Sequence, residues 1–242
     1  MTKGATTRTV IREVKNVEFE IIETADPFTR FREDIETVWK KHCFHNPSAF
    51  SEKILNLFDK EETEDGLKLR IGWINYYEAF YSKYVGNILT RSLFSGGYIL
   101  TSDGYYCLAV DWENQINLIG GLASKDDFKD GRFVPELCLI RESKEEMGID
   151  ITDEHFRYEL KYLKTSSDDE YYSPVGLLYE VKTDHTRKEL EDMFMRNSHD
   201  NELQTIQFVR PDNPEGCVLN TRRKYIIELF NLIRLKTESP AE

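Results

Sequence analysis

The chain has 242 residues, of which 40% are hydrophobic and 31% are charged, and its formal net charge is −12 at pH 7. This length is sufficient to bury the core of one large domain, or of one domain with a smaller appendage. A negative charge of this size repels a phosphate backbone, and no stripe of basic and aromatic residues offsets it, so we do not expect nucleic acid as a partner. A small phosphorylated substrate is still compatible with this charge, provided that cations make the binding site locally positive.

No apolar run reaches the roughly 18 residues that a membrane span requires, and the first residues, MTKGATTRTVIREVK, lack the apolar centre of a secretory signal. We therefore expect a soluble, cytoplasmic protein that does not bind a membrane. The four cysteines lie far apart with no CxxC pair, which predicts neither a zinc knuckle nor a dense disulfide framework. The oligomeric state is left open, with a homodimer among the alternatives.

Residues 1–90 are predicted to form an N-terminal α+β extension. The segment 17–22, VEFEII, alternates apolar and polar residues as a strand does, and 28–43 carries apolar residues at helical spacing. A turn at Asn46-Pro47 leads into an apolar segment. The segment 67–73 is then predicted as a strand and 74–89 as a helix.

Residues 91–238 show the pattern of a mixed-sheet α/β domain. Two apolar segments, 93–101 and 105–111, flank the turn Ser102-Asp103-Gly104 and predict a hairpin. The strand INLIGG at 116–121 ends in two glycines, the polar segment 122–133 is expected to be a loop, and a helix is expected between Pro135 and Gly148. The later predicted elements are strands at 156–165, 175–183 and 203–210 and helices at 186–196 and 221–236.

The helix that begins at Pro135 carries three glutamates within five positions, Glu142, Glu145 and Glu146. At about 100° per residue they fall within an arc of about 100°, on a face that the core does not require. Like charges at these spacings destabilise an isolated helix by a few tenths of a kcal/mol per pair, so another interaction is expected to offset the repulsion.

Two explanations of this acidic arc are open. Solvated glutamate-rich faces neutralised by lysine or arginine are common, and Arg141 and Lys144 are the basic residues close by. Hard divalent cations are the other explanation, because carboxylate oxygens one helical turn apart can converge on Mg²⁺ or Mn²⁺ and leave room for water and substrate phosphates.

The run INLIGG followed by RESKEEMGI resembles the Nudix box of the Nudix hydrolases, whose pattern is GX5EX7REUXEEXGU, with U a bulky aliphatic residue. The resemblance implies a Nudix-type α/β/α sandwich with a mixed sheet, in which the three glutamates bind Mg²⁺ or Mn²⁺ and act in catalysis. It also implies that Arg141 holds the loop and the helix together, and we place Arg141 with Gly120 and Gly121 at the substrate-binding side of the site. The matching positions are Gly121, Arg141, Glu142, Glu145, Glu146, Gly148 and Ile149.

The sequence departs from this pattern in two respects. Gly121 and Arg141 are 20 positions apart where the pattern has 14, so six residues are inserted within 122–133. Counted back from Arg141, the first glutamate of the pattern falls on Phe133, and Ser143 replaces the aliphatic U. Glu136, in the first turn of the helix, is expected to interact with the helix dipole and not to replace that glutamate.

Residues 39–50 and 73–80 resemble the N-terminal extension of the eukaryotic uridine diphosphate glucose pyrophosphatase branch of the Nudix proteins, whose box is also stretched. This resemblance implies hydrolysis of a nucleoside diphosphate linked to another group, with a UDP-sugar giving UMP and a sugar 1-phosphate. ADP-ribose or another nucleoside diphosphate derivative is the alternative substrate. The general base is either a box glutamate or an acid of the later loop, where Asp168, Asp169 and Glu170 are available and we select Glu170.

A competing hypothesis is a Nudix-like module that binds a nucleotide without catalysis. The missing first glutamate favours this hypothesis, and the presence of all three helix glutamates favours the enzyme. Tyr171 and Tyr172, in the same acidic loop, are expected to stack on a base or to pack in the protein.

Overall fold

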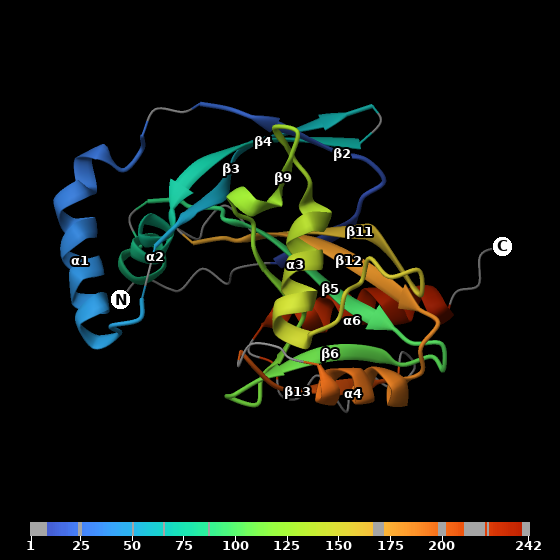
Figure 1. Cartoon of the computed structure of the whole chain (residues 1–242). Coiled ribbons are helices and arrows are strands. Elements are labelled where there is room, and N and C mark those ends of the chain that lie inside the picture. The colour runs from blue at the N-terminus through green and yellow to red at the C-terminus, as the bar shows by residue number, and fades with distance from the viewer. Residues whose placement is uncertain are drawn as a thin grey trace.

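The computed structural model describes residues 9–23, 26–49, 51–64, 66–86, 88–166, 172–197, 202–210, 221 and 223–238. Its main sheet has the strand order β1-β11-β12-β5-β6-β13, and the short strands β7 and β8 pair with β6 and β5 (Figure 1). Strands β12 and β5 are parallel, and the other neighbours along this order are antiparallel. The strands are β1 Thr9–Glu13, β5 Leu93–Leu100, β6 Tyr106–Asp111, β7 Ile116–Asn117, β8 Ile119–Leu122, β11 Phe156–Ser166, β12 Val175–Thr183 and β13 Leu203–Val209.

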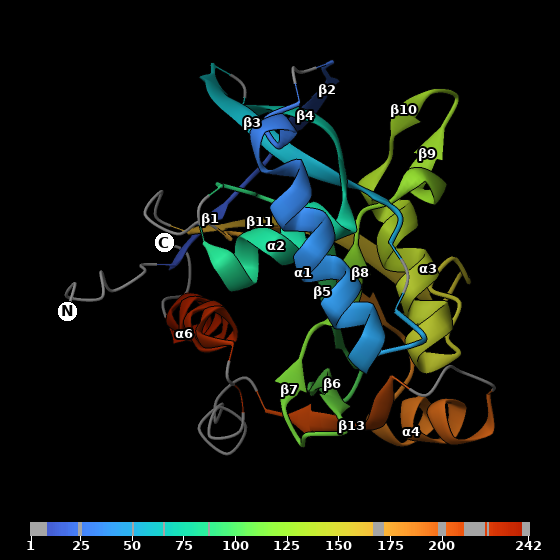
Figure 2. The same ribbon diagram turned by 90° about the vertical axis from the view of Figure 1, so that its left-hand side faces the viewer.

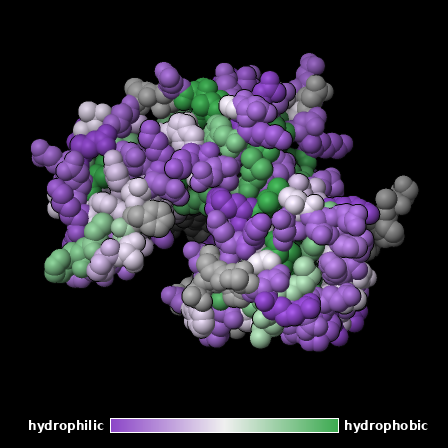
Figure 3. All heavy atoms as spheres, in the orientation of Figure 1, coloured by the Kyte–Doolittle hydropathy of each residue, from purple (hydrophilic) through white to green (hydrophobic). Residues whose placement is uncertain are grey.

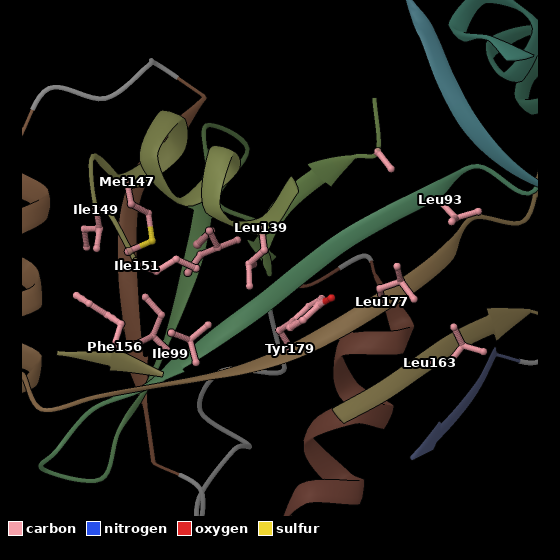
Figure 4. Close-up of a cluster of buried hydrophobic side chains, with 14 of the residues drawn as sticks. Leu93, Ile99, Leu139, Met147, Ile149, Ile151, Phe156, Leu163, Leu177 and Tyr179 are labelled. Atoms are coloured by element: carbon pink, nitrogen blue, oxygen red, sulfur yellow. The ribbon is translucent and has the colours of Figure 1, made fainter. Parts of the chain in front are cut away.

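Helices cover both faces of this sheet. Helices α3 (Pro135–Met147) and α4 (Arg187–Arg196) pack on one face, and α6 (Lys224–Glu238) packs on the other. Successive side chains of β6 alternate between the two faces, since Cys107 packs in the cluster with α3 and Leu108 in the cluster with α6. Figure 4 shows Leu139 and Met147 of α3 reaching toward the side chains of the strands. The predicted α/β/α sandwich with a mixed sheet is therefore confirmed.

The N-terminal segment forms a second, three-stranded sheet with the order β2-β4-β3. Strand β2 is parallel to β4 and β3 is antiparallel to it. Two helices accompany this sheet and lie side by side, with Trp39 of α1 in contact with Phe80 of α2 (Figure 2). The elements are β2 Val17–Ile21, the 3₁₀ turn Thr29–Phe31, α1 Arg32–His45, β3 Lys53–Thr63, β4 Gly66–Asn75 and α2 Tyr76–Val85.

Several predicted boundaries differ from the observed ones. The helix expected at 74–89 is shorter, because the Asn75 capping box begins it and Gly86, with a φ of 72°, ends it. Strand β1 was not predicted, and it pairs with β11, so residues assigned to the extension contribute to the main sheet. The division of the chain at residue 90 stays a prediction.

In the described part of the chain no helix is long and apolar enough to cross a membrane.

The prediction of a polar loop at 122–133 is wrong. Leu122 belongs to β8, Lys125–Asp127 form a 3₁₀ turn, and β9 (Phe128–Lys129) and β10 (Arg132–Phe133) form a small hairpin. The segment is mostly polar, but two aromatic residues, Phe128 and Phe133, lie at the two ends of this hairpin. Phe128 stacks on Trp73 of β4 with ring centres 5.2 Å apart, and Phe133 meets Phe19 of β2 edge-on at 5.0 Å. The hairpin thereby joins the N-terminal sheet to the segment before α3.

We expect Phe133→Ala to lower the free energy of unfolding by about 3 kcal/mol, because Phe133 is only 7% exposed and its removal leaves a cavity between the hairpin and β2. Urea denaturation followed by tryptophan fluorescence measures the change. The same substitution at Phe44, which is 81% exposed, is the matched control and should change stability by less than about 0.5 kcal/mol. Equal stabilities of the two variants would show that the hairpin contributes no packing.

Candidate active site

Strand β8 brings two glycines into close contact with β5 and α3. Gly120 has a φ of 146°, and a Cβ at this position would overlap the carbonyl oxygen of Ser95 in β5, so only glycine fits there. A Cβ at Gly121 would overlap the carboxylate of Glu142 in α3. The glycine pair therefore lets the backbone of β8 approach its neighbours more closely than other residues allow.

Helix α3 presents its three glutamates in different environments. Glu146 is 7% exposed, the Glu142 side chain is 12% exposed, and the Glu145 side chain is 52% exposed. Of the two explanations of the acidic arc, the solvated face therefore does not apply to Glu142 and Glu146. Burial of these carboxylates must be compensated by hydrogen bonds or by cations.

The two buried carboxylates lie against the glycine backbone. The N–H of Gly120 donates to Oε2 of Glu146 at 2.9 Å, and the carboxylate of Glu142 lies directly over Gly121. Burial disfavours the charged form and raises the pKa of Glu142 to about 7, against the opposing effect of Arg141. The geometry thus brings Gly120, Gly121, Glu142 and Glu146 together.

Arg141 connects α3 with the residues that follow β8. Its Nη1 donates to Glu142 at 2.6 Å and to Glu145 at 3.3 Å, its Nε donates to Asp127 at 3.3 Å, and its Nη2 donates to the carbonyl of Leu122 at 3.3 Å. Burial acts to lower the pKa of Arg141, but the neighbouring carboxylates outweigh it and the pKa is raised. The guanidinium is directed at protein acceptors and offsets the repulsion between Glu142 and Glu145.

Asp127 is an acid of this site that we did not identify from the sequence. It is completely buried, and its Oδ2 accepts the N–H of Ser124 at 2.7 Å while its Oδ1 accepts Nε of Arg141. Counted forward from Gly121, Asp127 occupies the first acidic position of the pattern GX5E, where the count back from Arg141 led to Phe133. The six inserted residues are therefore 128–133, the hairpin β9–β10. The forward count and the Ser-x-x-Asp spacing of a capping box were the available signals.

Of the other acidic residues considered in the sequence analysis, the structure describes Glu136 but not those of the later loop. Asp168, Asp169 and Glu170 lie outside the described residues, as does Tyr171. Glu136 lies in the first turn of α3, as expected, and its Oε1 accepts the hydroxyl of Tyr179 at 3.3 Å. It is not among the carboxylates that contact Arg141 or the glycine pair.

The chemistry of the three glutamates fits a hard divalent cation. Carboxylate oxygens are the ligands that Mg²⁺ and Mn²⁺ prefer, and the contacts to Nη1 of Arg141 show that Glu142 and Glu145 can reach one common cation. Among the described residues, however, no three His, Cys, Asp or Glu side chains form a group arranged to hold a metal. In this arrangement Glu142 and Glu145 accept hydrogen bonds from Arg141, and Glu146 accepts one from Gly120.

A cleft of about 450 Å³ opens beside the glycine pair, a volume typical of small-molecule sites. The backbone of Gly120 and Gly121 forms part of its wall, and its described lining residues include three cations and no carboxylate. The described lining of the cleft is therefore positively charged, opposite in sign to the chain as a whole. Of its polar lining residues, only Tyr172 was singled out from the sequence. The cations and tyrosines of the cleft are Lys83, Lys164, Arg223, Tyr76, Tyr172 and Tyr225.

No protein-family model matches the chain, and no curated protein matches it either. Among solved structures, Tm1382, a candidate Nudix hydrolase, is 16% identical with a TM-score of 0.51, and the match covers 76% of this chain and 100% of that one. DR0079 from Deinococcus radiodurans is 15% identical with a TM-score of 0.47, over 75% of this chain and 99% of that one. A hydrolase of the NUDIX family from Clostridium perfringens is 14% identical with a TM-score of 0.41, over 61% and 99%. Of these three, Tm1382 superposes closely enough to identify the fold, and the fold of this chain is of the Nudix type.

We expect Asp127→Asn to lower the free energy of unfolding by about 2 kcal/mol, because the neutral amide leaves the partly buried guanidinium of Arg141 with a weaker partner. Urea denaturation measures the change. Asp126→Asn is the matched control, since Asp126 is exposed, and it should change stability by less than about 0.5 kcal/mol. A loss of stability in both variants alike would show that Asp127 does not anchor Arg141.

Proposed function

We propose that this protein is a metal-dependent hydrolase that cleaves the diphosphate bond of a nucleoside diphosphate linked to another group. The observation that carries the proposal is the position of Glu142 and Glu146 of α3, both largely removed from water, at the glycine backbone that also lines the cleft. Carboxylates are kept in such a place at a cost, which a bound cation offsets. The similarity to Tm1382 supports the fold only, whereas the proposed activity rests on the carboxylates of α3.

Glu142, Glu145 and Glu146 are the residues that would hold Mg²⁺ or Mn²⁺. When bound, the metal would neutralise phosphate oxygens and withdraw charge from the phosphorus under attack. In the reaction, the oxygen of water forms a bond to one phosphorus, and the bond from that phosphorus to the bridging oxygen breaks. The bridging oxygen leaves with the other phosphoryl group. A carboxylate accepts the proton of the water, and Glu170 and the helix glutamates are the candidates.

The neighbouring residues hold these carboxylates in place. The N–H of Gly120 fixes one oxygen of Glu146, and Arg141 links α3 to the loop through Asp127 and Leu122. A side chain oriented before the substrate arrives does not have to be ordered during the reaction, which favours catalysis. In this proposal Arg141 therefore positions the carboxylates, and it lies at the side of the site where the substrate binds.

A UDP-sugar is our first candidate substrate, which would give UMP and a sugar 1-phosphate. The three cations of the cleft suit the diphosphate, and its tyrosines suit a base. ADP-ribose and other nucleoside diphosphate derivatives have the same recognition elements and are the alternatives.

A nucleotide-binding module without catalysis is the second candidate. Its supporting observation is that Glu142 and Glu145 are both paired with Arg141, so that two of the three carboxylates already have a cation. Such a module would bind nucleotides tightly with no turnover, and substitution of Glu142 or Glu146 would leave its affinity unchanged.

Incubation of the protein with Mg²⁺ and a panel of UDP-sugars, ADP-ribose, dinucleoside polyphosphates and coenzyme A tests the hydrolase directly, with release of UMP or AMP as the measurement. We expect turnover of at least one compound, its loss in EDTA, and a drop of about 100-fold or more for Glu146→Gln. Glu154→Gln, at an exposed position, is the matched control and should keep full activity. Calorimetry that finds no uptake of Mg²⁺ or Mn²⁺, with or without nucleotide, would exclude the proposed metal site.

A second variant tests the role of the glycine pair. We expect Gly121→Ala to reduce turnover by about tenfold or more while it lowers stability by less than about 1 kcal/mol, because its Cβ meets the movable end of Glu142 and displaces that carboxylate. Steady-state kinetics and urea denaturation together measure the two effects. Gly96→Ala is the control, since a Cβ there meets nothing closer than 3.5 Å. Unchanged turnover in Gly121→Ala would argue against a role for Glu142.

A further inference from the structure

Helix α1 packs on the rest of the protein through one side only. Ile35 on that side is completely buried, and Trp39 contacts Phe80 of α2. Figure 2 shows α1 in front of the other elements, and in the described part of the chain no element lies over its outer side. This outer side is therefore a helix face without a partner.

The outer side of α1 divides into an acidic half and a basic half, with Thr37 between them. At about 100° per residue, the exposed side chains within about 60° of Thr37 are two acids before it and two lysines and a phenylalanine after it. These residues are Glu33, Asp34, Lys40, Lys41 and Phe44. Figure 3 shows this flank of the molecule as largely hydrophilic, with apolar surface at the lower end of α1.

The charges of this face are available to a partner. Within the described residues, Glu33, Asp34 and Lys41 form no ion pair, and Lys40 has one exposed contact, with Glu36 at 3.5 Å. The helix dipole by itself favours acids at the start and bases at the end of a helix. It does not account for an aromatic ring on the same exposed face.

Phe44 is 81% exposed, more than the other large hydrophobic side chains in the described part of the chain. Large apolar side chains that stand in water beside a patterned polar surface are typical of protein–protein contacts. A ring at one end of a face with two opposite charges therefore indicates a protein partner.

A second copy of the chain, turned end to end, complements this face. A twofold axis at Thr37, perpendicular to α1, places the two acids of one copy against the two lysines of the other, and symmetry repeats the contact. A parallel pair would instead bring like charges together. The short side chain of Thr37 lets the helices approach closely, and its hydroxyl already donates to the carbonyl of Glu33 at 2.8 Å, so burial leaves no unpaired donor.

The same axis gives Phe44 a contact. Seven positions separate Phe44 from Thr37 and Thr37 from Arg30, so Phe44 of one copy reaches the exposed Arg30 of the other. The guanidinium of Arg30 lies 4.6 Å from the ring centre of Phe31, and a planar guanidinium can bind a second ring on its other side. The two rings supply the apolar part of the contact, because exposed ion pairs alone contribute little.

We propose that the outer side of α1 is a homodimer interface, in which two copies of the chain pair antiparallel about Thr37. One pair of helices makes a small interface, so we expect a dissociation constant on the order of 10 µM. Urea denaturation well below this concentration reports the stability of the monomer. The dimer is independent of the proposed hydrolase, since none of these residues belongs to the candidate active site.

Sedimentation equilibrium of the full chain, from about tenfold below to about tenfold above this constant, measures the association. We expect a monomer that becomes a dimer, and a dissociation constant raised at least about tenfold by Phe44→Ala, because one ring is lost from each end of the contact. Met195→Ala is the matched control, since Met195 lies on α4 and is 75% exposed. A chain that stays monomeric throughout, or a dimer that Phe44→Ala does not weaken, would overturn the proposal.

Charge reversal tests the antiparallel orientation. Lys40→Glu combined with Lys41→Glu makes the outer side acidic throughout, and Glu33→Lys combined with Asp34→Lys makes it basic throughout, so we expect each variant alone to be monomeric. Mixed in equal amounts, the two variants should form a heterodimer, because an acidic face then meets a basic one. Circular dichroism verifies that each variant is folded. A mixture of folded variants that stays monomeric would contradict the pairing.

A control with the same change in net charge separates the effect of this face from that of overall charge. Lys125→Glu combined with Lys129→Glu reverses two exposed lysines outside α1. We expect this variant to dimerise as the unaltered chain does. Loss of the dimer in this variant to the same extent as in the α1 variants would overturn the assignment of the interface to α1.

Discussion

The contact of helix α3 with the backbone of β8 depends on two residues that have no side chain. Gly120 can adopt its positive φ beside Ser95 and direct its N–H at Glu146, and Gly121 leaves the space that the carboxylate of Glu142 occupies. A Cβ at Gly120 would overlap the backbone of β5, and a Cβ at Gly121 would displace the carboxylate of Glu142. The same two residues line the cleft, so one stretch of bare backbone lies between the acidic cluster and the basic cavity.

The size of each electrostatic interaction decides which of them dominates at the site. Like charges one helical turn apart cost a few tenths of a kcal/mol, whereas opposite charges at about 4 Å attract by roughly 1 kcal/mol in water and by about 4 kcal/mol at the effective dielectric constant of a protein surface. The contacts of Arg141 with Glu142 and Glu145 therefore outweigh the repulsion within the helix. By the same reasoning, three cations in one cleft can admit a small anion although the chain as a whole carries −12.

The hairpin β9–β10 lengthens the segment before α3 without separating Asp127 from Arg141. Its ends, Phe128 and Phe133, are paired with each other, so the inserted residues leave and return at nearly the same place. Both rings then pack on the N-terminal sheet, through Trp73 and Phe19. The N-terminal segment thus contacts the site in two ways, through this aromatic cluster beside the loop that holds Asp127 and through helix α2 at the cleft.

The sequence by itself determined the features that depend on neighbours a few positions apart. Pro135 and Gly148 set the limits of α3, alternating residues marked most strands, and helical spacing placed Glu142, Glu145 and Glu146 on one arc. The tertiary structure alone decided that two of these glutamates are buried, that Asp127 faces Arg141, that β1 pairs with β11, and that Lys83, Lys164 and Arg223 meet in one cleft. The physical reason is that local rules describe the period of one helix or strand, whereas distances between segments far apart in the chain are set by how the elements pack.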